Sequence, residues 1–179
     1  MRRSILSAGV CALLVCCFSS VSLSQGSIGV YLDDLHSRAD TVVTGPFILL
    51  EIYVWTFPGP NGLLCSEFAM EYSEHAIPSY HTFNAELLSE TEGDVFTGLR
   101  LCFSGCQTEP QWLFQQNIFH TETYSEIKVV AHPSVGIIRF TTCDIEQQFE
   151  EAGVSSSVHA YYFPIGTAEA SWGAVKSLF

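Results

Sequence analysis

The sequence predicts an all-β protein, an antiparallel β-sandwich of about nine strands. Short runs of β-branched and aromatic residues recur about every ten residues, a spacing typical of sandwiches and barrels. Gly, Pro, Asn and Ser separate these runs, most clearly in the turn at residues 58–62, where Pro fixes φ and Gly accepts positive φ. Helix propensity rises only at residues 144–152, which leaves room for one short helix.

Each expected strand is a short apolar run bounded by turn residues. The strand at residues 47–57 is apolar on both faces, so one face enters the core. The other face is either covered by a loop or by the last segment of the chain, or it displays Tyr53, Trp55 and Phe57 as an aromatic row. We expect strands at residues 27–32, 47–57, 65–72, 80–87, 95–103, 112–120, 126–131, 136–142 and 156–163.

Residues 1–24 have the composition of a secretory signal peptide. Arg2 and Arg3 give a positive start, residues 5–18 are almost wholly apolar, and small residues precede the cleavage site expected after Ser24. The apolar run is shorter than the roughly 20 residues of a spanning helix. We therefore expect a protein that is not membrane-spanning after signal removal and is secreted or held at the cell surface, with the periplasm as the alternative.

Lipidation at Cys16 or Cys17 is a competing interpretation of the same segment, although Val15 is large for the residue before an acylated cysteine.

After cleavage, about 155 residues remain, which suits a single domain with one core. We place that domain at residues 25–166 and a linker and tail at residues 167–179. The tail either docks on its own sandwich or acts as a sorting signal.

Four cysteines remain once the signal is removed: Cys65, Cys102, Cys106 and Cys143. An even number in an exported chain favours two disulfides, which can form in three connectivities. We favour Cys65 with Cys102 and Cys106 with Cys143, because Cys102 and Cys106 are an even number of residues apart on one expected strand and its exit. A zinc site is the competing interpretation, but the chain lacks the CxxC or HxxxH pairs that usually supply zinc ligands.

The chain is acidic, with a formal net charge of −12 at pH 7. Such a charge repels nucleic acid and anionic lipid, so we expect no nucleic-acid partner. The sequence contains no phosphate-binding P-loop, no GxGxxG and no GxSxG motif, which argues against nucleotide-dependent enzymes and common serine hydrolases. Its oligomeric state is left open.

Glu90, Glu92 and Asp94 alternate in a segment that also contains Thr and Gly, and we expect them in a solvated hairpin loop. Two functional alternatives remain. Gly93 would let the loop fold around a calcium ion, so calcium is the one cofactor that the sequence suggests. The carboxylates could also serve a secreted carbohydrate-active hydrolase, because glycosidases use paired carboxylates.

Aromatic residues are the candidate binding residues: Tyr53, Trp55 and Phe57 on one expected strand, Trp112 and Phe114 on another. Rings that point outward in a row stack on sugars or contact a partner protein, whereas rings that point inward fill the core.

Three segments carry a family resemblance: the opening strand at residues 29–34, the strand, turn and strand at residues 47–68, and the Trp-Gly-x-x-Lys-x-Leu-aromatic tail at residues 172–179. Together they resemble small exported bacterial proteins with cohesin-like or immunoglobulin-like sandwiches, with a jelly roll as the alternative architecture. The resemblance implies an exported β-sandwich; it brings no catalytic motif and does not imply dockerin binding. We therefore expect a non-catalytic domain, not an enzyme, that binds a glycan or a cell-surface protein or has a structural role.

Overall fold

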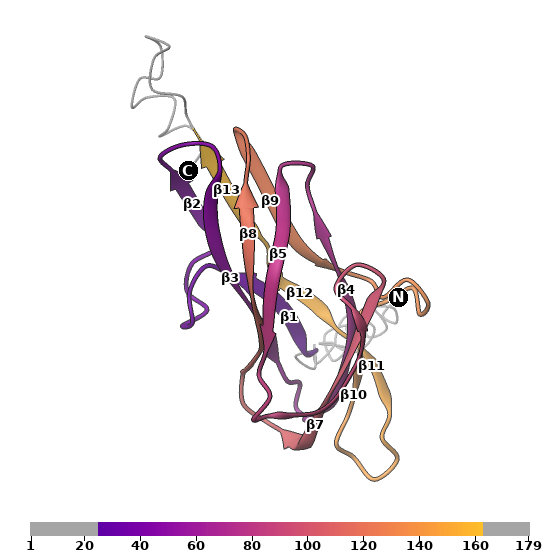
Figure 1. The fold of residues 1–179 in the computed structure, drawn as a ribbon. Helices are drawn as coiled ribbons and strands as arrows, with labels where there is room; N and C mark the ends of the chain where they lie inside the picture. The colour runs from indigo at the N-terminus through magenta and orange to yellow at the C-terminus, as the bar shows by residue number, and fades with distance from the viewer. Residues whose placement is uncertain (1–24, 163–179) are drawn as a thin grey trace, which may run out of the picture.

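The computed structural model describes residues 25–162, which form two packed β-sheets and contain no helix (Figure 1). The predicted all-β sandwich is confirmed, with thirteen strands in this part of the chain. No segment of it is a helix long and apolar enough to cross a bilayer. The expected signal peptide and the tail at residues 167–179 lie outside the described residues. The strands are β1 (Ser27–Tyr31), β2 (Asp40–Val43), β3 (Ile48–Phe57), β4 (Leu63–Tyr72), β5 (Ala76–Phe83), β6 (Leu88–Asp94), β7 (Gly98–Gln107), β8 (Gln111–His120), β9 (Tyr124–Val130), β10 (Arg139–Thr141), β11 (Phe149–Glu151), β12 (Gly153–Ser156) and β13 (Val158–Tyr162).

The first sheet has five strands in the order β12-β1-β3-β8-β5. β3 is its centre and pairs antiparallel with β1 on one edge and with β8 on the other. Side chains alternate along a strand, so Leu50, Ile52 and Val54 of β3 point inward and are buried, as predicted for this strand. The odd-numbered side chains of β3 point outward and form the surface described below.

The second sheet has eight strands and is organised around β4. Across residues 63–68, β4 lies between β7 and β10, and across residues 69–72 it pairs with β9. β9 and β10 therefore follow each other along one edge of β4, and the loop at residues 131–138 interrupts them. β6 pairs with β7 at the far side, so that β6, β7, β4 and β10 present one continuous outward surface.

The core lies between the two sheets and is filled by aromatic and branched side chains. Phe68 of β4 and Phe114 of β8 come from opposite sheets, and their rings are nearly parallel with centroids 6.4 Å apart. Phe114 is fully buried and is a core residue, which corrects the sequence expectation that it could belong to a binding surface. Further fully buried side chains are Ile28, Ile52, Leu63, Leu99, Leu101, Leu113, Ile118 and Ile127.

Two disulfides join the predicted partners. Cys65–Cys102 links directly paired residues of β4 and β7, whose Cα atoms are 4.0 Å apart. Cys106–Cys143 links β7 to the second residue after β10, with a Cα separation of 5.6 Å. Its sulfurs pack on Gly62, where a Cβ atom would lie 2.6 Å from the Cys106 Sγ and where φ is +69°. Glycine is required at this turn for both reasons.

The helical turn expected at residues 144–152 is absent. A carboxylate oxygen of Asp144 accepts hydrogen bonds from the Thr142 hydroxyl and from the backbone N–H of Gln148, and Gln147 has a φ of +46°. These features make a tight turn, after which β11 pairs antiparallel with β10. The hydrogen bonds of the Asp144 side chain to the turn are an alternative to helix formation.

Strand boundaries also differ from the sequence expectation in several places. Residues 90–94, expected as a solvated hairpin loop, belong to β6, and β2, β11 and β12 were not expected as separate strands. β5 begins four residues earlier than predicted, at Ala76, and ends at Phe83. Each of these strands is an edge strand of its sheet. Edge strands are less buried, so the apolar alternation that identifies a strand is weak in them.

Candidate functional site

The outward surface of the five-stranded sheet, which we call the open face, is divided along its length into three zones. At the end where β3 begins, the outward side chains are apolar; in the middle they are polar; at the end where β3 finishes they are aromatic. The open face consists of Leu49, Glu51, Tyr53, Trp55 and Phe57 of β3, Trp112, Gln115, Asn117 and Phe119 of β8, and Ile77 and Thr82 of β5.

The aromatic zone contains four of the five predicted binding residues, and it is partly covered. Trp55 pairs across the strands with Trp112, and the ring of His36 lies 4.6 Å from Trp55 and 5.3 Å from Phe57. His36 belongs to the loop between β1 and β2, which folds back over the end of the sheet. Tyr53, at the border of this zone, donates a hydrogen bond to Glu51.

The loop that carries His36 reduces the access of a ligand to these aromatic residues. The Nε1 atom of Trp55 and the Nδ1 atom of His36 are both buried and have no hydrogen-bond partner among the described residues. Hydrogen bonding to Glu51 raises the pKa of Tyr53 to about 12. Glycan binding by Tyr53, Trp55, Phe57 and Trp112 therefore stays a prediction, for a surface that the chain itself partly covers.

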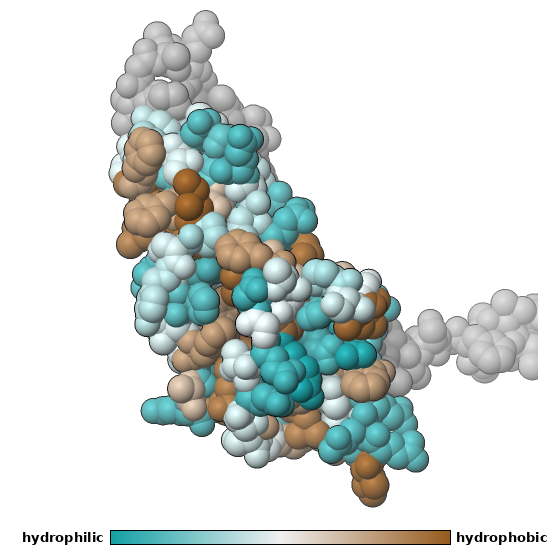
Figure 2. Space-filling model, turned by 45° about the vertical axis from the view of Figure 1, so that its right-hand side comes forward, coloured by the Kyte–Doolittle hydropathy of each residue, from teal (hydrophilic) through white to brown (hydrophobic). Residues whose placement is uncertain are grey.

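The apolar zone was not singled out from the sequence. Leu49, Phe119 and Ile77 lie side by side on β3, β8 and β5, because Phe119 is the cross-strand partner of both other residues. Their side chains remain 52%, 42% and 51% exposed. Figure 2 shows apolar side chains in brown near the upper end of the molecule, the end at which β3 begins and β8 ends in Figure 1. The apolar run at residues 47–57 contained a signal for Leu49, but the pairing that brings the three residues together was not visible.

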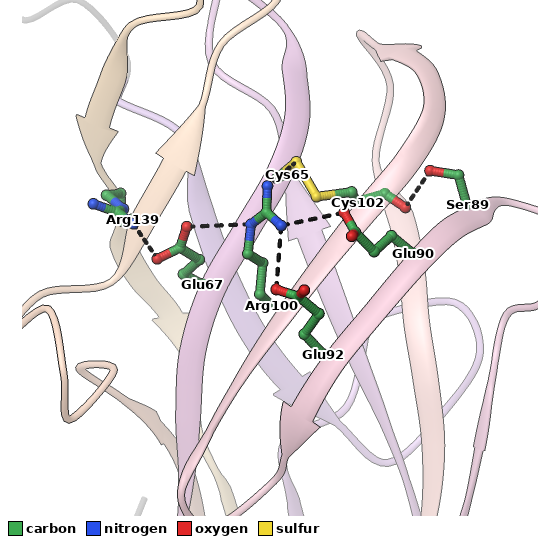
Figure 3. Close-up of a disulfide and its surroundings, with 8 residues drawn as sticks. All are labelled: Cys65, Glu67, Ser89, Glu90, Glu92, Arg100, Cys102 and Arg139. Atoms are coloured by element: carbon green, nitrogen blue, oxygen red, sulfur yellow. Dashed lines mark hydrogen bonds and ion pairs between the residues drawn. A yellow bond between two sulfur atoms is a disulfide. The ribbon is translucent and has the colours of Figure 1, made fainter.

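The outward surface of the eight-stranded sheet, which we call the charged face, has the opposite character. Glu67 of β4 is only 6% exposed and binds two arginines: its Oε1 atom lies 3.6 Å from the Nε atom of Arg100, and its Oε2 atom accepts a hydrogen bond from Arg139. Arg100 of β7 also lies 3.2 Å from Glu90 and 3.2 Å from Glu92 of β6. Figure 3 shows Arg100 at the centre of this row, beside the disulfide.

The disulfide Cys65–Cys102 is part of the same surface. The Cys65 Sγ atom lies 3.9 Å from a terminal nitrogen of Arg100, and Cys102 is opposite Glu90 in the pairing of β6 with β7. The hydroxyl of Ser89 donates to the Cys102 carbonyl. β4, β6 and β7 are therefore joined at this point by a disulfide, by ion pairs and by strand pairing.

The three carboxylates predicted as calcium ligands make different contacts in the structure. Glu90 and Glu92 face Arg100, whereas Asp94 accepts hydrogen bonds from the backbone N–H groups of Phe96 and Thr97 and from the Thr97 hydroxyl. These bonds lower the pKa of Asp94 and stabilise the turn between β6 and β7. Residues 25–162 contain no group of three or more His, Cys, Asp or Glu side chains arranged to hold a metal ion. Calcium binding stays a prediction without a preformed ligand cluster in this part of the chain.

An open pocket of about 700 Å³ lies on the charged face. Its floor is formed by Glu67, Arg100 and Arg139, one wall by the β6–β7 hairpin, and the others by the loop at residues 131–138 and by Phe149 of β11. The sequence did not predict this pocket, because it depends on a loop inserted between two strands that follow the same edge of β4.

Comparison with known proteins concerns the fold. No family model matches the chain, and no curated protein matches it by sequence. The sixth cohesin of scaffoldin B from Acetivibrio cellulolyticus, solved in complex with a Cel5 dockerin, matches with a TM-score of 0.54 at 9% identity over 78% of this chain and 100% of that one. The fold is cohesin-like.

Two further structures support the cohesin-like fold. A type III cohesin module from the ScaE cell-surface anchoring scaffoldin of Ruminococcus flavefaciens has a TM-score of 0.54 at 10% identity, over 77% of this chain and 87% of that one. A non-cellulosomal cohesin from the archaeon Archaeoglobus fulgidus has a TM-score of 0.50 at 9% identity, over 78% of this chain and 92% of that one. The expected cohesin-like β-sandwich is thus confirmed, and the likeness is one of fold.

Proposed function

We propose that this chain is an exported, non-catalytic protein-binding module that contacts its partner through the apolar zone of the open face. The observation that carries the proposal is the alignment of Leu49, Phe119 and Ile77 on three adjacent strands, each about half exposed. Uncovered apolar side chains that touch one another on a rigid sheet are a typical feature of contact surfaces.

The surroundings of the apolar zone suit a protein partner. Glu51, Asn117, Gln115 and Thr82 follow directly along β3, β8 and β5, so that polar groups border the apolar centre. Protein interfaces commonly have this arrangement, in which a few apolar or aromatic residues contribute most of the binding free energy and a polar rim excludes water. Leu49 and Ile77, on either side of the Phe119 ring, offer no hydrogen bonds. They therefore suit apolar side chains of a protein partner better than a sugar, whose hydroxyl groups need many hydrogen bonds.

Two further observations support a binding module outside the cell. The cohesin from Acetivibrio cellulolyticus, of the same fold, was solved bound to a dockerin, which is itself a protein. The two disulfides of this chain suit an oxidising compartment. The partner of this chain is defined here by chemistry alone: a protein with an apolar surface that can cover Phe119.

The hydrolase alternative is less well supported by the geometry. Glu90 and Glu92 share one guanidinium group, that of Arg100, and the third carboxylate at that group, Glu67, is buried between two arginines. In this arrangement the arginines neutralise the carboxylates. A glycosidase instead needs two carboxyl groups with different roles, one as general acid and one as base or nucleophile.

Site-specific photo-crosslinking in the producing cell tests the proposal. A benzophenone amino acid is placed at Phe119, and, as a matched control, at Glu71, which is exposed on the outward surface of the other sheet. We expect a crosslinked protein adduct from position 119 that is absent from position 71, and mass spectrometry identifies it.

Other outcomes would refute the proposal. Equal adducts from both positions would show non-selective contact, and the absence of any adduct at 119, 49 and 77 would remove the apolar zone as a contact surface. An adduct consisting only of a second copy of this chain would replace the proposed partner by self-association.

A further inference from the structure

The pocket on the charged face lies on the opposite side of the sandwich from the apolar zone, so it would serve a different ligand. Its volume of about 700 Å³ falls within the range of small-molecule sites, about 300–1,000 Å³. It is an open pocket, which suits the end or the middle of a longer molecule as well as a small one.

The floor of the pocket is polar and charge-balanced. The buried carboxylate of Glu67 is bound by Arg100 and Arg139, and Arg100 also binds Glu90 and Glu92 (Figure 3). Among the charged side chains that line the pocket, two carboxylates, those of Glu67 and Glu92, thus face the two guanidinium groups. An anionic ligand would meet the carboxylates and the overall charge of −12, and a cationic ligand would meet the arginines.

The walls offer both hydrogen-bond donors and acceptors. The backbone N–H of Ser134 donates to the Nδ1 atom of His132, which places the proton of the neutral ring on Nε2, a donor. Arg139 donates a hydrogen bond to Glu67 through one terminal nitrogen, while its Nε atom is buried and has no hydrogen-bond partner among residues 25–162. Glu92 binds Arg100 through Oε2, which leaves Oε1 as an acceptor in the pocket wall.

His132 is held at the pocket wall by a glycine. Gly98 has a φ of +116°, and a Cβ atom there would lie 2.4 Å from the Nε2 atom of His132. The imidazole ring therefore packs directly against the backbone at the start of β7. Because only glycine permits both the conformation and the contact, the position of His132 is built into the fold.

Phe149 supplies an aromatic wall. The guanidinium carbon of Arg139 lies 4.4 Å from the centre of its ring, yet the side chain remains 64% exposed. The ring is thus oriented by the arginine while much of its surface is open to a ligand. Aromatic faces attract the weakly positive C–H groups of other molecules.

From these groups we infer that the pocket binds an uncharged saccharide, as a monosaccharide or as one unit of a neutral glycan. Each sugar hydroxyl both donates and accepts hydrogen bonds, which matches a pocket lined by the guanidinium group of Arg139 and by His132 as donors and by Glu92 as an acceptor. The C–H face of the sugar ring packs on Phe149. A neutral ligand also avoids the charge conflict that an anion or a cation would meet on the floor.

The test uses the disulfide-bonded protein on an array of neutral and acidic oligosaccharides, followed by calorimetric titration of the neutral oligosaccharide that gives the strongest signal. Phe149→Ala and His132→Ala should each weaken binding roughly tenfold or more, whereas Phe149→Tyr, which keeps the ring, should bind. Ile145→Ala is the matched control, because Ile145 lies in the same hairpin and is fully exposed. Melting temperatures confirm that each variant is folded.

Three outcomes would overturn the inference: no binding of any neutral oligosaccharide, binding that Phe149→Ala leaves unchanged, or binding confined to acidic oligosaccharides. Phe119→Asp, on the open face, separates this site from the proposed protein contact. We expect that variant to keep saccharide binding, so that failure of one proposal leaves the other open to its own test.

Discussion

The two outward faces of this sandwich use their side chains in different ways. On the charged face, Glu67, Arg100 and Arg139 bind one another beside the disulfide Cys65–Cys102. On the open face, Leu49, Phe119 and Ile77 are exposed next to one another. Side chains that are bonded within the chain contribute to stability, whereas uncovered apolar side chains contribute little to it and are available to a partner. The contrast therefore separates residues that stabilise the fold from residues that can bind.

The largest expected effect concerns the two disulfides, which provide a matched pair because each spans a sequence separation of 37. The chain-entropy model predicts that removing either one costs about 4 kcal/mol of unfolding free energy. Cys65→Ala with Cys102→Ala, and Cys106→Ala with Cys143→Ala, should therefore give similar losses in urea denaturation. A loss near zero for Cys65–Cys102 would show that the ion pairs and strand pairing hold the charged face without a covalent bond.

Substitution of two phenylalanines of β8 compares the stability contribution of the core with that of the open face. Phe114→Ala removes a fully buried ring and should cost about 4 kcal/mol of unfolding free energy, measured by urea denaturation. Phe119→Ala removes a 42% exposed ring from the same strand and should change stability by less than about 1 kcal/mol. A large loss at Phe119 would mean that the apolar zone stabilises the fold, and the contrast between the faces would fail.

Two glutamates of β4 test the charged face. Glu67→Gln leaves Arg100 and Arg139 without their shared carboxylate and should cost roughly 2–3 kcal/mol, somewhat below the usual loss for a broken buried pair because both arginines are partly exposed. Glu71→Gln, which breaks an exposed pair with Lys128, should leave the thermal midpoint nearly unchanged. Equal shifts for the two variants would contradict a special role for the buried carboxylate.

The smallest expected effect is a pH dependence of stability that arises in the core behind the open face. His120 is fully buried, its Nδ1 atom is 2.8 Å from the Ser125 hydroxyl, and its Nε2 atom has no partner among the described residues. Burial lowers the pKa of His120, so the unfolded chain, with a histidine pKa of about 6.5, takes up the proton first. Stability should be complete above about pH 6.5 and decrease below it, by at most about 1.4 kcal/mol per pH unit.

Thermal melts between pH 7 and pH 5 check this dependence, and His120→Gln should flatten it. Asp33, Asp94 and Asp144 have a lowered pKa because hydrogen bonds stabilise their charged forms, so their contributions are lost only at lower pH, below about 4. A slope between pH 7 and pH 5 that persists in His120→Gln would assign it to another group.

Much of the fold followed from local patterns in the sequence. The apolar residues at 47–57 predicted a strand with one face in the core, which is β3. The even number of cysteines predicted two disulfides, and the connectivity favoured from the even spacing of Cys102 and Cys106 is the one that the structure contains. The helix expected at residues 144–152 failed because the side chain of Asp144 binds the backbone of a turn, an interaction that helix propensity does not weigh.

The binding residues were harder to predict, because they depend on which strands pair. Trp112 and Phe114 are two residues apart and were assigned to one face, but a bulge shifts the pairing so that Val54 opposes Phe114 while Trp55 opposes Trp112. The extra residue turns Trp112 outward and leaves Phe114 in the core. Likewise, the apolar zone comes from three strands, and no single run of the sequence contains it.

The affinity of two variants for the partner protein recovered by crosslinking at position 119 tests the central claim most directly. Phe119→Asp and Glu71→Gln change one outward residue on each face, and calorimetric titration measures binding to that partner. We predict at least about a hundredfold loss for Phe119→Asp and no loss for Glu71→Gln, with both variants as stable as the parent. Equal affinities for the two variants would contradict the assignment of binding to the open face.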